Sequence, residues 1–142
     1  GRRAVMIERF IPGRELTVGV IGNDKLEALP VIEIVPDARY EFFDYEAKYQ
    51  PGATDEICPA QVPDAIRDQA QEYAMRAHKA LRLSGYSRTD MRLAPDGNFY
   101  LLETNTIPGM TATSLLPKMA AAHGLSFAEF LEKLIKLGME KR

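Results

Sequence analysis

Residues 85–105 read GYSRTDMRLAPDGNFYLLETN, in which two segments of alternating apolar and polar character flank the dipeptide Asp96-Gly97. An Asp-Gly pair between two such segments is the strongest short-range signal for a β-hairpin. The sequence therefore predicts two antiparallel strands joined by a two-residue loop at Asp96-Gly97.

This predicted loop fixes which residues face each other across the hairpin. Counting back from it places Asp90 opposite Glu103 and Arg88 opposite Asn105. Because side chains alternate between the faces of a strand, these polar groups share one face. The other face is expected to form a buried layer of Met91, Leu93, Tyr100 and Leu102. Like charges directly opposite each other destabilise a strand pair, so the pairing of Asp90 with Glu103 points to a bound divalent cation.

The polar face has two interpretations. Asp90, Glu103 and Asn105 offer the oxygen ligands that Mg²⁺ takes together with phosphate and water. The alternative is a solvated face on which Arg88 forms a structural ion pair with the acids. Arg88 could also hold a carboxylate or a developing oxyanion, because its planar fork donates directed hydrogen bonds. The opposition of the acids, with an amide two residues along, favours the metal site, and an ion pair of Arg88 is compatible with it.

The composition fits one domain. The chain has 142 residues, of which 46% are hydrophobic, and this is enough for one core. A formal charge of -2, from 18 basic and 20 acidic residues without a basic cluster, argues against nucleic-acid binding. Cys58 is the single cysteine and no apolar run is long enough to cross a bilayer, so we expect a cytoplasmic protein without membrane association.

The pattern of the remaining chain predicts further strands and helices. Strands are expected at residues 4–11, 15–21, 26–35 with an interruption at Pro30, and 40–43. Helices are expected from Pro63 until Ser84-Gly85, around 116–122, and from Ser126, where Glu129 completes a capping box. The order of strands, helix, strands and helices, with hairpins instead of alternating crossovers, predicts an α+β fold with a mainly antiparallel sheet flanked by helices.

The apolar faces of two helices can be assigned in advance. The first helix should bury Ile66, Ala70, Tyr73, Ala74, Ala77 and Leu81, and the last should bury Phe127, Phe130, Leu131, Leu134 and Ile135. His78 is expected on a mostly polar helix face, with a structural role. His123 has no metal-ligand spacing, and Cys58 is expected to act as a small apolar residue.

Two further segments could carry function. Residues 44–62 show no periodicity but contain two tyrosines and a lysine, and long loops of this kind are usually functional or disordered. Thr113-Ser114-Leu115 leads into a helix, whose free N–H groups and dipole suit a small carboxylate or phosphate. The alternative at this helix start is plain N-capping by Ser114 or Thr113, and Gly109 could be only a turn residue.

Three segments resemble the D-alanine:D-alanine ligase family of the ATP-grasp superfamily: RTD at 88–90, LETNTIPGMT at 102–111 and FDYEAKY at 43–49. The first two occur in looser form across ATP-grasp enzymes, whereas the DYEAKY segment and the NTxPGMT run followed by Ser114-Leu115 are much narrower. The resemblance extends along nearly the whole chain. It implies that residues 1–142 form a single carboxy-terminal ATP-grasp domain.

The resemblance also implies an activity. Members of this family use ATP to phosphorylate the carboxylate of one D-alanine, and the amine of a second D-alanine then attacks the acylphosphate to give the dipeptide for peptidoglycan. By match to the family, Asp90, Glu103 and Asn105 would bind two Mg²⁺ ions, with Mn²⁺ as a possible replacement. Arg88 and the N–H of Gly109 would stabilise the tetrahedral oxyanion.

Further roles follow from the same match. Ser114 and Leu115 would hold the carboxylate of the second D-alanine. The adenine segment would be Glu8, Arg9, Phe10 and Ile11, with Glu15 on the ribose and Phe42 and Leu102 packing against adenine, although the hairpin register places Leu102 on the face away from the metals. Lys48 and Tyr49 would lie in a lid that excludes water from the acylphosphate.

The resemblance leaves part of the family without a counterpart. The amino-terminal domain and the small ATP-grasp subdomain are not represented, and the chain starts at Gly1 without an initiator Met. We therefore expect the later part of a longer enzyme, which would be a homodimer when complete. Two alternatives stay open: an ATP-grasp ligase for another pair, such as D-alanine and D-lactate, and a non-catalytic module that binds ATP and Mg²⁺.

Overall fold

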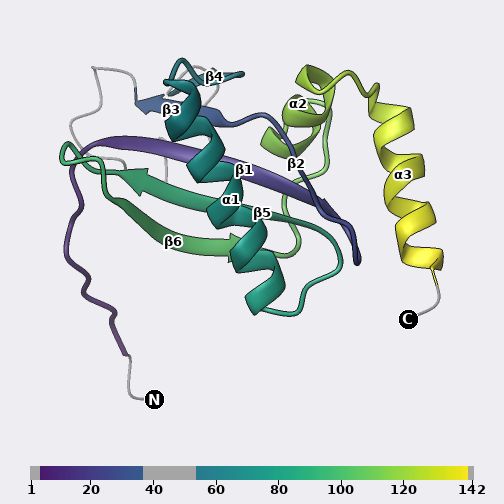
Figure 1. The fold of residues 1–142 in the computed structure, drawn as a ribbon, viewed down its shortest axis with the longest axis horizontal. Coiled ribbons are helices and arrows are strands. Elements are labelled where there is room, and N and C mark those ends of the chain that lie inside the picture. Colours follow the sequence, from purple (N-terminus) through teal and green to yellow (C-terminus); the bar gives the residue numbers. More distant parts are fainter. Residues whose placement is uncertain (1–3, 37–53, 141–142) are drawn as a thin grey trace.

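The computed structural model describes residues 4–36 and 54–140. Its strands are β1 (Arg14–Gly22), β2 (Glu27–Ala28), β3 (Ile32–Pro36), β4 (Thr54–Ile57), β5 (Gly85–Leu93) and β6 (Phe99–Asn105). Its helices are α1 (Asp64–Ala80), α2 (Leu115–Ala122) and α3 (Phe127–Met139). Figure 1 shows how these elements are arranged. No helix in the described part of the chain is long and apolar enough to cross a membrane.

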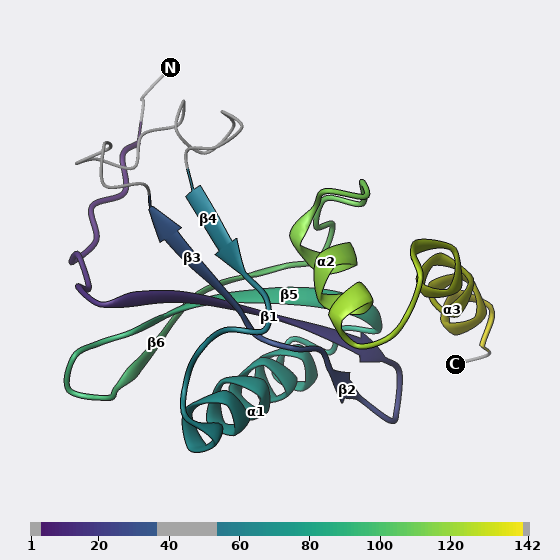
Figure 2. The same ribbon diagram turned by 90° about the horizontal axis from the view of Figure 1, so that it is seen from above.

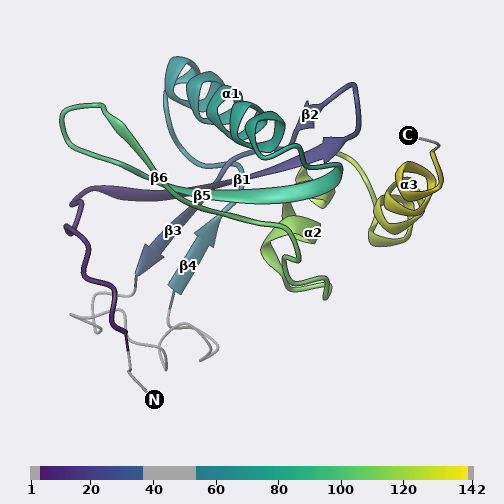
Figure 3. The same cartoon turned by 90° about the horizontal axis from the view of Figure 1, so that it is seen from below.

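All strands belong to one antiparallel sheet in the order β4-β3-β1-β5-β6, and β2 pairs with β1 beyond the end of β3. Helices α1 and α2 lie on opposite faces of this sheet, and α3 lies beside α2 (Figures 2 and 3). The predicted fold class, α+β with an antiparallel sheet flanked by helices, is confirmed.

The two faces of the sheet bury separate apolar clusters. The cluster on the α1 face contains Leu16, Val18, Val20, Val31, Ala70, Ala74, Met91 and Leu93. The cluster under α2 and α3 contains Ile21, Leu29, Ile32, Leu116, Met119, Ala120 and Phe130. Burying both faces of its central strands fixes the sheet between the helices, because removal of apolar surface from water is the main driving force for folding.

The hairpin of β5 and β6 has the predicted pairing but not the predicted loop. Asp90 faces Glu103 and Arg88 faces Asn105, as counted from the sequence. The loop, however, is closed by Ala94 and Asn98 and comprises residues 95–97, with Gly97 at φ 84°. The longer loop shifts the register by one residue, and a β-bulge next to Asp90 shifts it back.

The longer loop and the bulge together explain why the expected buried layer is only half formed: the loop places Tyr100 opposite Arg92, and the bulge contains Leu102. Met91 and Leu93 are buried against α1, as predicted, but Tyr100 and Leu102 are exposed. Leu102 lies between the paired positions Leu101 and Glu103 and has no partner of its own on β5. Simple alternation therefore does not assign Leu102 to the face away from the metals.

The predicted strand at residues 4–11 is wrong. The segment is irregular, and the side chains of Val5 and Ile7 are 83% and 91% exposed. An extended segment needs a neighbouring strand to satisfy its backbone groups, and no strand of residues 14–36 or 54–105 pairs with it. The strand expected at 40–43 lies outside the described residues, and β4 was missed because its sequence, TDEI, shows no apolar alternation.

The helices begin where predicted, but two of their assigned faces differ. Helix α1 ends at Ala80, before the expected Ser84-Gly85 stop, through a Schellman-type turn in which Leu83 N–H donates to the carbonyl of His78. Leu81 therefore lies in the cap and is exposed. His78 was expected on a polar face but is buried, and it shares a hydrogen bond of 2.8 Å with Ser87.

Helix α3 buries less of its apolar stripe than expected. The predicted capping box of Ser126 and Glu129 is present, but only Phe130 of the stripe is buried, and Phe127 and Ile135 are exposed. Polar contacts help to attach the helix. Lys133 Nζ donates to Glu27 at 2.6 Å, and the side-chain amide of Asn23 donates to the carbonyl of Leu137 at 2.9 Å.

Candidate functional site

The site face of β5 carries alternating charges. Arg88, Asp90 and Arg92 are partly exposed, while the residues between them are buried toward α1. The antiparallel pairing places Thr17 of β1 opposite Asp90 and Glu15 opposite Arg92. Because residues i and i+2 of a strand share a face, these side chains form one continuous polar surface across β1 and β5.

Arg88 and Asp90 form a two-pronged ion pair at the centre of this surface. Arg88 Nε donates to Asp90 Oδ1 and Arg88 Nη2 to Oδ2, both at 2.8 Å. Thr17 Oγ1 donates to the same Oδ1 at 2.6 Å. Hydrogen bonding to Asp90 raises the pKa of Arg88, burial opposes this rise, and the charges of Asp90, Glu103 and Glu15 add to it. The ion pair that the sequence left open for Arg88 is therefore present.

This ion pair changes the electrostatic argument for a metal. The positive charge of Arg88 already lies next to the Asp90 carboxylate. The pairing of Asp90 with Glu103 across the hairpin therefore does not by itself require a metal cation. The donor set nevertheless suits one. Glu103 is exposed. Among residues 4–36 and 54–140, Asp90 Oδ2 accepts a hydrogen bond from Arg88 alone, and each carboxylate oxygen offers two lone pairs. Asn105 Oδ1 lies opposite Arg88 and accepts from Ile107 N–H at 2.9 Å.

No group of three or more His, Cys, Asp or Glu side chains in the described ranges 4–36 and 54–140 could hold a metal ion. The predicted set does not require such a group, because it consists of two carboxylates and an amide. Mg²⁺ also keeps water and phosphate ligands in most of its protein sites. The metal site at Asp90, Glu103 and Asn105 therefore stays a prediction that rests on its donor set.

The start of α2 brings Gly109 and Ser114 together. A Cβ atom added at Gly109 would lie 2.8 Å from Ser114 Oγ. Ser114 occupies the N-cap position, but its side chain makes no capping bond to the helix. It shares a hydrogen bond of 2.8 Å with Thr111 Oγ1 and accepts from Thr111 N–H at 3.1 Å. Plain capping by Ser114 is therefore not observed, and the amide groups of the first turn, including that of Leu115, have no side-chain cap.

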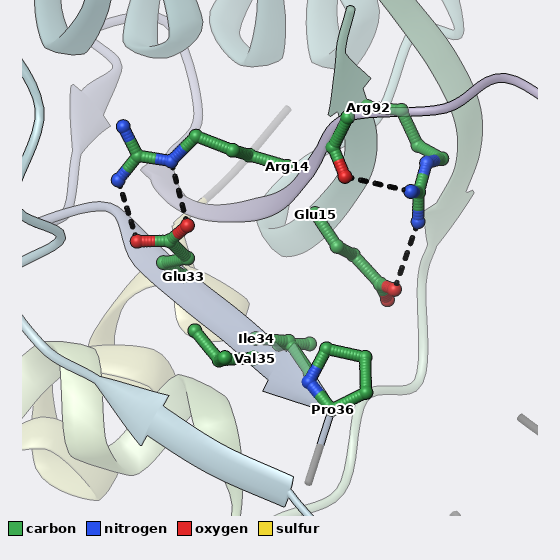
Figure 4. A pocket seen from close by; sticks show the side chains of 8 residues that line it. Arg14, Glu15, Glu33, Ile34, Val35, Pro36 and Arg92 are labelled. Carbon is green, nitrogen blue, oxygen red and sulfur yellow. Dashed lines mark hydrogen bonds and ion pairs between the residues drawn. The ribbon is translucent and has the colours of Figure 1, made fainter. Parts of the chain in front are cut away.

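A pocket of about 240 Å³ opens at the other end of the polar surface. Glu15 lies within it. The ion pair of Arg14 with Glu33 is on one side of Glu15, and Arg92, which contacts the Glu15 carboxylate, is on the other (Figure 4). The remaining walls come from Gly13, Ile34, Val35 and Pro36. The pocket places the predicted ribose-binding acid on the same sheet surface as Asp90.

The predicted adenine segment is only partly built. Glu8, Arg9 and Phe10 are exposed, and Ile11 is half-buried. The guanidinium carbon of Arg92 lies 5.4 Å from the centre of the Phe10 ring. Leu102 is exposed at the bulge. Phe42, Lys48 and Tyr49 lie outside the described residues, so their roles stay predictions.

Sequence reasoning missed two residues of this surface. Arg92 follows Asp90 by two positions, and the periodicity that placed Arg88 and Asp90 on one face could have found it. Thr17 could not be found in this way, because its contact with Asp90 depends on the pairing of β1 with β5, which join residues 73 apart in sequence.

The fold is similar to those of two solved ligases. The VanG D-Ala:D-Ser ligase from Enterococcus faecalis is 39% identical with a TM-score of 0.74, over 90% of this chain and 37% of that chain. The D-alanine–D-alanine ligase from Bacillus anthracis complexed with ATP is 33% identical with a TM-score of 0.76, over 93% of this chain and 40% of that chain. The fold and the polar face of β5 and β6 thus define the chain as an ATP-grasp protein.

The particular family is shown by the sequence match. The model of the family described as D-ala D-ala ligase C-terminus matches residues 2–136, and the chain belongs to this family. A D-alanine–D-alanine ligase from Desulfotalea psychrophila (strain LSv54 / DSM 12343) is 65% identical over 138 residues, which are 97% of this chain and 43% of that protein. The chain thus spans less than half the length of this relative.

Proposed function

We propose that this chain is the carboxy-terminal part of an ATP-dependent D-alanine:D-alanine ligase. In the proposed reaction, the γ-phosphoryl group of ATP passes to the carboxylate oxygen of one D-alanine and ADP leaves. The amine of a second D-alanine then attacks the acyl carbon, loses a proton, and displaces inorganic phosphate. The chain matches 43% of the length of the Desulfotalea relative. The remaining groups of the reaction would be supplied by the part of the full-length protein that corresponds to the unmatched part of this relative.

One observation carries the proposal: the residues that match the family motif, Arg88, Asp90, Glu103 and Asn105, face each other on one side of the hairpin. A hairpin that served only as a solvated surface would not need a half-buried arginine fixed by both oxygens of Asp90. Arg88 is held at 2.8 Å by both oxygens of Asp90, so its fork is oriented before any ligand arrives. Preorganised donors of this kind are the largest electrostatic contribution in many enzymes.

The proposed roles follow from this placement. Arg88 and the Gly109 amide would stabilise the oxyanion of the tetrahedral intermediate, and Ser114 with Leu115 would hold the carboxylate of the second D-alanine. The contact of Gly109 with Ser114 supports placing these two functions next to each other. Asp90, Glu103 and Asn105 would hold two Mg²⁺ ions, which neutralise phosphate charge when bound, and Mn²⁺ is a possible replacement. Lys48 and Tyr49 would belong to a lid, and the complete enzyme would be a homodimer.

The experiment is a coupled assay of phosphate release and dipeptide formation with the full-length protein that carries this chain. We expect D-alanine-dependent release of ADP and phosphate and the appearance of D-alanyl-D-alanine. Arg88→Ala should depress kcat more than it raises the KM for ATP, whereas an equal loss in both would make Arg88 a structural or nucleotide-binding residue. Residues 1–142 alone should show no ligation, because ATP would be bound from one side only.

A second candidate differs only in the second substrate. A similar solved structure is that of a D-Ala:D-Ser ligase, so we include D-serine and D-lactate as competitors of the second D-alanine. Dominant formation of a mixed product would replace the dipeptide ligase by this candidate. Nucleotide binding in the presence of Mg²⁺ without any turnover would instead favour the non-catalytic module.

A further inference from the structure

Arg92 makes three separate contacts at the pocket around Glu15. It faces Glu15 directly across β1 and β5, and Nη1 lies 3.5 Å from the carboxylate. Nη2 donates to the carbonyl of Gly13 at 2.8 Å. The guanidinium also lies over the ring of Phe10. One side chain thus connects the acid on β1 to the irregular segment that leads into this strand.

The neighbouring Arg14 provides a comparison at this end of the sheet, because its guanidinium is paired with both oxygens of an acid. Arg14 donates to both oxygens of Glu33 at 2.6 Å and to the carbonyl of Gln61 at 2.9 Å, and no buried nitrogen of its guanidinium is left without an acceptor in the described part of the chain. Arg92 has a weaker contact with its acid, and its buried Nε has no partner among the described residues. An arrangement that leaves a buried donor unsatisfied is not optimised for stability alone, and such exceptions concentrate at functional sites.

The position of Arg92 also separates it from the reacting groups. On β5 it is two residues beyond Asp90 and four beyond Arg88, toward the loop of the hairpin. It contacts the side chains of Phe10 and Glu15, which the family match places on adenine and ribose, and in the described part of the chain it forms no hydrogen bond or ion pair with Asp90 or Arg88. Its influence should therefore fall on the nucleoside end of ATP.

We infer that Arg92 is a positioning residue that holds the carboxylate of Glu15 for the ribose hydroxyl groups and fixes Phe10 and Gly13 beside the base. This inference rests on the proposed function, because it takes ATP as the ligand of the pocket. The cross-strand contact limits the rotamers of Glu15, and the bond to Gly13 ties the entering segment to the edge of the pocket. Arg92 itself does not touch the reacting atoms.

The test is Arg92→Met in the full-length protein, which keeps an apolar stem but removes the fork. Titration calorimetry with ATP, 2′-deoxy-ATP and 3′-deoxy-ATP measures ribose recognition, and steady-state assays measure KM and kcat. We expect about tenfold weaker ATP binding, the size expected for one lost charge-assisted hydrogen bond. The preference for ATP over the deoxynucleotides should shrink toward one, with kcat and the KM for D-alanine unchanged.

Two further variants separate positioning from a general loss of structure. Arg92→Lys keeps the charge next to Glu15 but cannot reach the Gly13 carbonyl and cover Phe10 together, so it should recover part of the ribose preference. Glu15→Gln should lose the same preference, and adding Arg92→Met to it should have little further effect. Arg67→Met, on α1 at the opposite face of the sheet, is the matched control and should bind all nucleotides like the parent protein.

The outcomes distinguish this inference from the proposed function. A parent protein that binds ATP with a ribose preference, lost in Arg92→Met, supports the inference even if no dipeptide is formed. An active parent whose Arg92→Met variant keeps the full preference overturns the inference and leaves the ligase intact. An equal rise in the KM for D-alanine and for ATP, or a parent without ribose preference, also overturns it.

Discussion

Gly19 of β1 lies directly against helix α2. A Cβ atom at this position would lie 2.4 Å from Leu116 Cδ1, 3.0 Å from Leu29 Cδ1 and 3.1 Å from Met119 Sδ. The backbone N–H of Gly19 also donates to Met119 Sδ at 3.1 Å. Gly19 pairs with Arg88 across β1 and β5, so the same residue lies beneath α2 and beside the candidate site.

Gly19→Ala should therefore destabilise the protein and move α2. Adding a methyl group to a filled core costs about 1–3 kcal/mol. Reduced entropy of the unfolded chain offsets about 0.4–1 kcal/mol of this cost. The free energy of unfolding should fall by about 1–2 kcal/mol, the net of these two terms. Because α2 begins directly after Ser114, the KM for D-alanine should rise while the KM for ATP changes little.

Urea unfolding of the full-length protein measures this loss, and hydrogen exchange in β1 and α2 localises it, since a large protein need not unfold in one step. Leu116→Val is the matched compensating change, because it removes the methyl group that the new Cβ would meet. The double variant should be more stable than the sum of the single losses by about 0.5 kcal/mol or more. Additive losses, or a Gly19→Ala variant as stable as the parent, would refute the steric reasoning.

Three other substitutions test separate features. Burial lowers the pKa of His78 below its usual 6.5 in the folded state. Around that pH the unfolded chain therefore binds more protons than the folded chain, and the free energy of unfolding falls as the pH drops. His78→Gln should remove this loss of stability between about pH 7.5 and 5.5, as measured by urea unfolding. Glu27→Gln should cost about 0.5 kcal/mol, because its contacts with Lys133 of α3 and with His123 at the end of α2 are solvent-screened, and hydrogen exchange should quicken in α3 and at the end of α2. Gly109→Ala should raise the KM for D-alanine at unchanged stability, because the new Cβ displaces the hydroxyl of Ser114.

The hairpin was predictable because local patterns determine it. The alternation of apolar and polar residues in β5 and the Asp-Gly turn placed Asp90 opposite Glu103, and the structure has this pair. The prediction succeeded although its loop was wrong, since the bulge at Leu102 cancels the shift from the longer loop. A bulge has no reliable sequence signal, so the exposure of Leu102 could not be predicted.

The rest of the site depends on contacts that no local pattern encodes. The pocket around Glu15 combines residues of β1, β3 and β5. The sequence of a single strand does not predict the order of these strands in the sheet. The contact of Ser114 with Thr111 replaces the expected helix cap and depends on how the preceding loop folds. The segment at 4–11 has strand-forming residues but no partner strand in the described sheet.

The charges of the site face are paired before any ligand is present. Arg88 holds Asp90, Arg92 faces Glu15, and Thr17 donates to Asp90 from the neighbouring strand. Since an unpaired charge at a half-buried position is costly, these contacts let the sheet carry several acidic and basic side chains on one surface. The same contacts fix the side chains that the proposed reaction uses. Stability and activity will therefore be coupled at this surface, and substitutions at Arg88 and Asp90 should have non-additive effects on turnover because each side chain orients the other.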